Sequence, residues 1–121
     1  QYTIAADRTN ETLEDIISHY QPSVLRMLKL IKDEIPKDTY ISVCGEMAND
    51  VNCLPLFVAL GVRELSMNYY SIPQIKKVIH DLSFKDCENI FNQCLELTSP
   101  EDIKNELYNL VKNKLPIYGS L

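Results

Sequence analysis

The chain has 121 residues, of which 45% are hydrophobic and 24% are charged, and its formal net charge is −5 at pH 7. These proportions are typical of one globular domain and exclude a disordered or fibrous chain. The longest apolar run, Leu54 to Val62, is about half the ~18 residues needed to cross a bilayer, and the lysines form no basic stripe. We therefore expect a cytoplasmic protein that binds neither membrane nor nucleic acid.

Two helical patterns come first along the chain. Glu11 to Tyr20 fits a short helix with Leu13, Ile16 and Ile17 on one face, and Pro22 ends it. An amphipathic helix is predicted from Ser23 to Pro36. Its apolar residues recur at positions 24, 27, 28, 31 and 35.

Two short strands are predicted next, with a helix after each. YISVC, Tyr40 to Cys44, lacks clean alternation, which is typical of a strand covered on both faces. Glu64 to Met67 is the second strand, and the helix between the two tolerates Pro55 in its first turn and ends at Gly61. This order of elements, strand, helix, strand and helix, predicts that the two strands are parallel and joined by a right-handed crossover. Ser71-Ile72-Pro73-Gln74 is a capping-box pattern that opens the second of these helices.

Two more helices complete the chain. They are predicted over Phe84 to Leu97, after a Ser83 cap, and over Pro100 to Lys114, after Ser99, with Asp102 at the capping-box position. The fold class is therefore α/β, with two parallel strands and about six helices. Because parallel strands normally lie in a wider sheet or a closed barrel, such a small sheet suggests that strands are missing.

The four cysteines lie at positions 44, 53, 87 and 94 with no Cys-x-x-Cys pair, and His19 and His80 are distant from them in sequence. This spacing does not indicate a zinc site. Cys87 and Cys94 share a helical stripe with Phe84, Ile90 and Phe91, so we predict that both are core residues. Free thiols fit a reducing compartment.

Cys44 differs from the other cysteines because it ends a predicted strand. In parallel α/β folds, functional residues gather at the carboxyl ends of strands, where Cys44, Gly45 and Glu46 follow the first strand and Asn68 follows the second. The position favours a functional cysteine. A packed, inert cysteine remains the alternative on position alone.

Five stretches in order carry a resemblance to a known family: QYTIAADRTNE, VLRMLKLI, ISVCGEMAND, LPLFVALGVRELSMN and SIPQIKKVI. The chain resembles the C-terminal part of the phosphoenolpyruvate-utilising enzymes, from residue 1 to about 82 and more loosely beyond. Within the family it is most similar to the branch of enzyme I, the phosphoenolpyruvate-protein phosphotransferases of bacterial sugar uptake. Pyruvate phosphate dikinase and phosphoenolpyruvate synthase share the CGE element, so a fragment of either is an alternative.

The resemblance implies a phosphoenolpyruvate-binding TIM barrel, (β/α)8, of which residues 1–121 form the C-terminal portion. The implied activity moves the phosphoryl group of phosphoenolpyruvate, with Mg²⁺, to an enzyme histidine and then to the histidine-containing phosphocarrier protein. In the family, the metal ligands and the phosphohistidine domain precede the part that this chain resembles. We therefore expect no metal ligand in this chain and no activity from it alone, because phosphoryl transfer needs concentrated positive charge.

The resemblance assigns two site residues. Arg8 matches the family arginine that contacts phosphoenolpyruvate, and a guanidinium fork suits paired oxygens. Cys44 matches the cysteine that exchanges a proton with the methylene carbon as enolpyruvate becomes pyruvate; a protonated thiol can act as a general acid. Glu46 receives no role, and Asp50 is predicted to cap a helix. Asn49 replaces a common family glycine, and we expect it to adopt a left-handed conformation.

A free-standing binding or regulatory module is the rival hypothesis. Gln1 is not an initiator residue and falls inside a motif that the family continues upstream, which favours a piece of an enzyme. In either case the two strands lack neighbours on at least one edge. We therefore expect a dimer or larger homo-oligomer, with the last two helices folding over the gap as the alternative.

Overall fold

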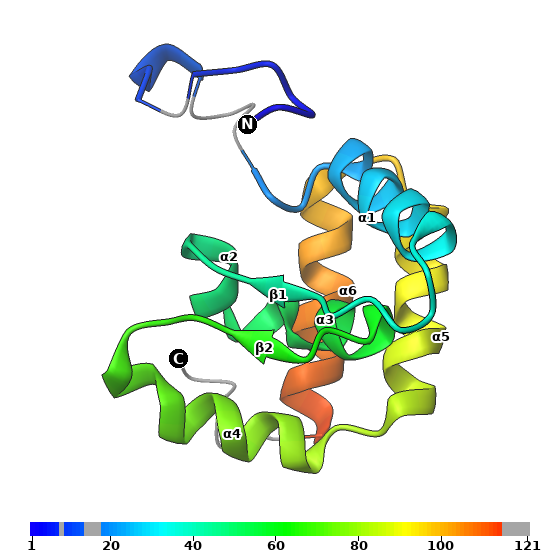
Figure 1. The fold of residues 1–121 in the computed structure, drawn as a ribbon. Coiled ribbons are helices and arrows are strands. Elements are labelled where there is room, and N and C mark those ends of the chain that lie inside the picture. The colour runs from blue at the N-terminus through cyan, green and yellow to red at the C-terminus, as the bar shows by residue number, and fades with distance from the viewer. Residues whose placement is uncertain (8, 14–17, 115–121) are drawn as a thin grey trace.

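A computed structural model of the chain describes residues 1–7, 9–13 and 18–114, and the side chains up to residue 112 (Figure 1). The described residues form a two-stranded sheet, six α-helices and three 3₁₀-helices. In chain order the elements are η1 (Glu11–Leu13), α1 (Pro22–Glu34), β1 (Ser42–Val43), α2 (Glu46–Asn49), η2 (Val51–Cys53), α3 (Leu54–Leu60), β2 (Glu64–Leu65), η3 (Tyr69–Ser71), α4 (Ile72–Asp81), α5 (Phe84–Leu95) and α6 (Pro100–Lys114). The predicted α/β class, with two strands and about six helices, is confirmed.

The two strands are parallel, as predicted, and Ser42 pairs with Glu64 and Val43 with Leu65. Both are shorter than the sequence indicated. Val43 and Leu65 pack against the helical core, whereas Ser42 and Glu64 are exposed. The prediction that the first strand is covered on both faces is therefore wrong: among the described residues, helices cover one face of the sheet only.

Helix α3 lies at the centre of the molecule. Six of its seven residues are buried, and it packs chiefly against α5 (Figure 1). A helix that is apolar on every side is stable only when it is enclosed in this way. Pro55 lies in its first turn, as predicted. Gly61 ends it with φ +75°, a left-handed conformation that strains any residue with a side chain, so the predicted C-cap is confirmed.

Two of the three predicted serine caps are confirmed. The Ser83 hydroxyl accepts the Asp86 backbone N–H at 3.3 Å, and the Ser99 hydroxyl accepts that of Asp102 at 3.4 Å. The capping box at Ser71 is wrong. Ser71 has helical backbone angles and makes no side-chain cap, because η3 runs directly into α4.

The predictions for the helices before β1 are confirmed in part. Helix α1 forms as predicted, and its expected apolar stripe is confirmed in part: positions 24, 27, 28 and 35 are half-buried and Ile31 is 43% exposed, whereas the fully buried Leu25 lies outside that stripe. Of the predicted helix over 11–20, residues 11–13 form η1 and residues 14–17 lie outside the described part of the chain. No helix among the described residues has the length and apolarity to cross a membrane.

The predicted core cysteines are confirmed, since Cys87 and Cys94 are both fully buried. Ile90 and Phe91 are buried beside them on α5, but Phe84 on the same predicted stripe is 56% exposed. Phe84 is the first residue of α5, where the helix begins at the surface.

Candidate functional site

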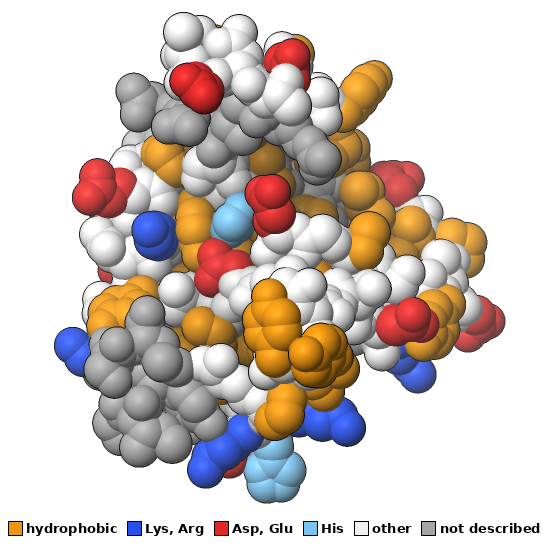
Figure 2. All heavy atoms as spheres, turned by 90° about the vertical axis from the view of Figure 1, so that its left-hand side faces the viewer, with side chains coloured by type: hydrophobic (Ala, Val, Ile, Leu, Met, Phe, Trp, Pro, Cys, Tyr) orange, Lys and Arg blue, Asp and Glu red, His pale blue; other side chains and the backbone are white. Residues whose placement is uncertain are grey.

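The carboxyl ends of both strands open onto one face of the molecule, which Figure 2 shows head-on. A cleft of about 370 Å³ lies there. It is lined by Gln1, Ile4, Ser18, His19, Val24, Cys44, Gly45, Glu46 and Met47. Cys44 is the exposed cysteine of the chain, and it follows β1 directly. Cys44 therefore lies at the carboxyl edge of the sheet, as predicted, with an accessible thiol in the cleft, and its catalytic role stays a prediction.

Backbone geometry and one amide side chain shape the loops at this edge. Gly45 has φ +81°, which favours glycine, and it turns the chain from β1 into α2. The Asn49 side chain donates to the Gly45 carbonyl at 3.2 Å and accepts the Asn68 N–H at 3.2 Å. It therefore ties the loop after β1 to the loop after β2. Asn49 itself is helical, so its expected left-handed conformation is wrong.

The remaining predicted site residues are less well defined. Arg8 lies outside the described residues, so its relation to Cys44 stays a prediction. Glu46 is exposed in the first turn of α2. Among the described residues that line the cleft, it contributes the one carboxylate, and none of these residues is a Lys or an Arg. Mg²⁺ requires a near-octahedral set of oxygens. The described lining does not fit that ion.

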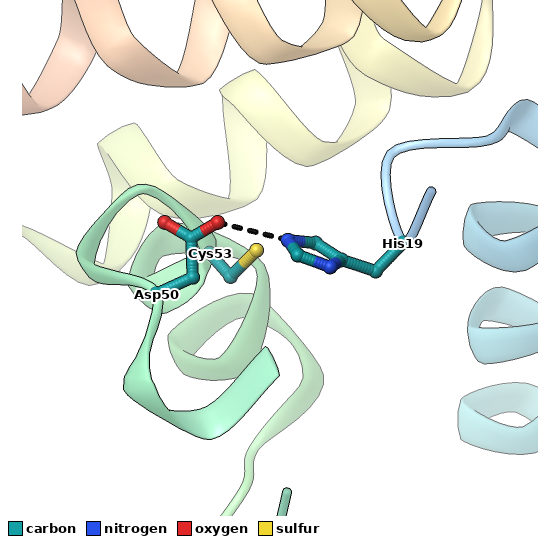
Figure 3. Close-up of side chains that lie close together, drawn as sticks. All are labelled: His19, Asp50 and Cys53. Carbon is teal, nitrogen blue, oxygen red and sulfur yellow. Dashed lines mark hydrogen bonds and ion pairs between the residues drawn. The ribbon is translucent and has the colours of Figure 1, made fainter. Parts of the chain in front are cut away.

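A second cluster of side chains lies behind the cleft (Figure 3). Three groups form hydrogen bonds with the Asp50 carboxylate, and two of them come from a segment that is thirty residues away in the sequence. Its Oδ2 lies 2.8 Å from His19 Nε2 and accepts the Tyr20 hydroxyl, and its Oδ1 accepts the Asn52 N–H at 3.0 Å. The bond from Asn52 confirms the predicted cap, although the helix it opens is η2. The fully buried Cys53 completes the cluster.

Burial and charge fix the protonation of this cluster. Burial raises the pKa of the Asp50 carboxyl, but hydrogen bonds from His19, Tyr20 and Asn52 outweigh burial and hold the pKa below its ordinary value. Burial, together with the nearby Asp50 carboxylate, raises the pKa of the Cys53 thiol. Burial is also the main cause that raises the pKa of the Tyr20 phenol. The phenol and the thiol are therefore neutral, and the carboxylate is charged.

No sequence motif predicts this cluster. His19 and Tyr20 come just before Pro22, whereas Asp50 and Cys53 flank η2, and no spacing motif connects the two segments. The one local signal is Asp50 itself, an acidic residue at the start of a helix, which predicts a cap and not a contact with His19. The contact itself depends on how the segment before α1 folds back over η2.

Comparison with known proteins gives a consistent family. Residues 1–84 match the model of the PEP-utilising enzyme, PEP-binding domain. The chain is 32% identical over 115 residues to the phosphoenolpyruvate-protein phosphotransferase of Mycoplasma genitalium and 34% identical over 113 residues to that of Staphylococcus aureus. It is also 32% identical over 108 residues to a phosphoenolpyruvate-dependent phosphotransferase system protein of Salmonella typhimurium.

These alignments cover 94%, 93% and 88% of this chain but only 20%, 20% and 14% of the three relatives. Almost the whole of this chain is therefore aligned, but it spans only about a fifth or less of the length of each relative. The domain of this family is a TIM barrel, and two parallel strands with their helices account for part of one. The chain belongs to the family of phosphoenolpyruvate-utilising enzymes, as a C-terminal part of their phosphoenolpyruvate-binding domain.

Proposed function

We propose that residues 1–121 are a single C-terminal portion of the phosphoenolpyruvate-binding barrel of a phosphoenolpyruvate-protein phosphotransferase. The whole enzyme would move the phosphoryl group of phosphoenolpyruvate to its own histidine and then to the histidine-containing phosphocarrier protein. The relatives named phosphoenolpyruvate-protein phosphotransferase support this reading. The proposal includes a cytoplasmic location, where free thiols such as those of this chain stay reduced.

Cys44 is the proposed proton donor, and its exposed thiol in the cleft is the observation that carries the proposal. When phosphoenolpyruvate loses its phosphoryl group, the enolate of pyruvate remains. A proton moves from Cys44 Sγ to the methylene carbon, so that the S–H bond breaks, a C–H bond forms and a thiolate is left. Water then returns a proton to the thiolate. This is general acid catalysis by a positioned thiol.

Arg8 is the proposed contact to the phosphate and carboxylate oxygens of phosphoenolpyruvate, by resemblance to the family. The Mg²⁺ that the family uses would supply positive charge to the phosphoryl group. Its ligands are not among the described residues of the cleft, so this chain by itself is expected to be inactive.

The test uses the longest reading frame that encodes this chain. Pyruvate formation and phosphorylation of the phosphocarrier are measured with phosphoenolpyruvate and Mg²⁺, for wild type, Cys44→Ala and the matched control Cys94→Ala. Cys94 is a buried cysteine on α5 that does not line the cleft, and no catalytic role is proposed for it. We expect Cys44→Ala to abolish pyruvate release and Cys94→Ala to keep it.

Two results would count against the proposal in different ways. An active protein in which Cys44→Ala forms pyruvate at the wild-type rate would remove the proton-donor role but keep the enzyme. A reading frame that adds no further barrel strands, with no turnover, would instead favour the free-standing binding module.

A further inference from the structure

The cluster behind the cleft brings together three side chains of different donor type. His19 comes from the segment before α1, and Asp50 and Cys53 flank the η2 turn. One donor atom from each lies within 4.8 Å of the others. Figure 3 shows the imidazole, the carboxylate and the thiol converging on a common point. We propose that His19, Asp50 and Cys53 bind a borderline-soft divalent cation of the zinc type.

The donor set selects the class of ion. One imidazole nitrogen, one carboxylate oxygen and one thiolate sulfur are the ligands found around zinc and cobalt, whereas Mg²⁺ and Ca²⁺ take oxygen donors. This site is therefore distinct from any Mg²⁺ site used in phosphoryl transfer. It also does not rest on the proposed function.

The distances need only small adjustments. Tetrahedral zinc bonds of about 2.0–2.3 Å place neighbouring ligand atoms roughly 3.3–3.7 Å apart. The His19 Nε2 and Asp50 Oδ2 atoms lie 2.8 Å apart, so an ion between them would widen this pair by about half an ångström. The Cys53 Sγ atom lies within 4.8 Å of the donor atoms of His19 and Asp50, and it would move toward the ion.

The surroundings already orient the carboxylate. The Asn52 N–H bonds Asp50 Oδ1 at 3.0 Å, and the Tyr20 hydroxyl donates to Asp50 Oδ2, which has a second lone pair for a metal. Such outer contacts hold metal ligands in place in known sites. The direct bond between His19 and Asp50 is exchanged for bonds from both residues to the ion.

Access is from the cleft. The His19 and Asp50 side chains are 32% and 22% exposed, and His19 lines the cleft, while Cys53 closes the inner side. On binding, the Cys53 S–H bond breaks, an S–metal bond forms and the proton passes to water. The ion would fasten the segment before α1 to η2, and so fix one wall of the cleft that contains Cys44.

Cobalt titration of the 121-residue chain tests the site, because Co²⁺ in a tetrahedral thiolate site absorbs strongly in the visible range and shows a sulfur-to-metal band in the near ultraviolet. We expect both signals to saturate at one equivalent and to disappear when Zn²⁺ is added. Cys53→Ser should lose the sulfur-to-metal band, and His19→Gln should lose the tetrahedral spectrum. Tyr20→Phe, which keeps the ligands, should weaken cobalt binding roughly 10- to 100-fold.

Controls separate this site from other donors. Cys87→Ser removes a buried cysteine elsewhere and His80→Gln an exposed histidine, and both should keep the full spectrum. Circular dichroism checks that each variant is folded; if Cys53→Ser does not fold, the half-exposed His19→Gln decides. The proposal is overturned if folded wild type gives no tetrahedral spectrum, if folded His19→Gln keeps it, or if Cys44→Ser alone abolishes it.

Discussion

At the residue scale, the four cysteines illustrate how position decides chemistry. Cys44 ends β1 and is exposed at the cleft, whereas Cys53, Cys87 and Cys94 are fully buried. The sequence predicted the burial of Cys87 and Cys94 and the position of Cys44 at a strand end, because a helical apolar stripe and a strand end are both local patterns. It left open whether Cys44 is exposed or packed. It could not place Cys53, whose neighbours come from a distant segment.

Thiol reactivity follows from this difference. In the folded protein we expect a disulfide reagent such as Ellman's to modify one thiol rapidly, that of Cys44, and the other three only when the chain unfolds. Counting the thiols modified with and without denaturant checks this. Cys44→Ser should remove the fast phase alone; a fast phase that survives in this variant would contradict the assignment.

Stability at alkaline pH should report the buried thiols of α5. Burial, with a smaller effect of nearby Asp86 and Glu106, raises the pKa of Cys87 and of Cys94 from 9 to about 11. Between these values the unfolded chain holds fewer protons than the folded chain, so the free energy of unfolding falls as pH rises, by up to about 1.4 kcal/mol per pH unit for each thiol. Below pH 9 this contribution is fully present.

Urea unfolding at pH 8.5 and pH 10.5 measures the effect in wild type and in a Cys87→Ala, Cys94→Ala double variant. The double variant should lose less stability over this range. An equal loss in both proteins would show that other groups, not these thiols, cause the alkaline sensitivity.

At the element scale, helix α1 shows the difference between forming a helix and docking it. Its period and its ends follow from the sequence, with Pro22 in the first turn. Which side it buries depends on the neighbours: α1 packs against α3 and α5 through Leu25, and Lys32 Nζ donates to the Ala59 carbonyl at 2.6 Å at the end of α3.

A matched pair of leucines on α1 tests this docking. Leu25→Ala should cost about 2–5 kcal/mol of unfolding free energy, because it leaves a cavity in the core. Leu30→Ala, on the same helix but 55% exposed, should change stability by no more than about 0.5 kcal/mol. Denaturant unfolding of both variants measures the difference. Similar losses in the two variants would contradict the docking of α1 through the face that contains Leu25.

At the scale of the whole molecule, the sheet is open on the side of β2. An apolar groove of about 320 Å³ lies between β2, α3 and α4. It is lined by Leu54, Phe57, Val58, Val62, Arg63, Glu64, Leu65, Met67, Ile72, Ile75, Lys76 and Ile79. In a complete barrel the next strand and helix would cover this side. For the chain by itself, a second copy is the expected occupant, which is the homo-oligomer predicted from the unpaired strand edges.

Light scattering over a range of protein concentrations checks this association. Wild type should show a mass above that of one chain at high concentration. Ile79→Glu, at a position 38% exposed in the groove, should shift the protein toward the monomer, and Leu30→Glu, on α1, should not. A monomeric wild-type mass at all concentrations, with a cooperative melt, would defeat the prediction.

The sequence by itself determined the local features of this protein: helix positions, the caps at Ser83, Ser99 and Gly61, the parallel order of the strands and the place of Cys44 directly after β1. These depend on hydrophobic period and on backbone preferences within a few residues. The same stretches carry the family resemblance, which the comparisons confirm.

Only the tertiary structure decided which faces are buried and which distant groups meet. The Asp50 contacts with His19 and Tyr20, the bridge made by Asn49 and the docking face of α1 all join segments far apart in the chain. No local preference encodes such contacts, because they depend on the packing of every element between the two partners. The coverage of the sheet is a further example. The sequence of the first strand is typical of a strand enclosed on both faces, but the helices of the described residues cover one face of the sheet.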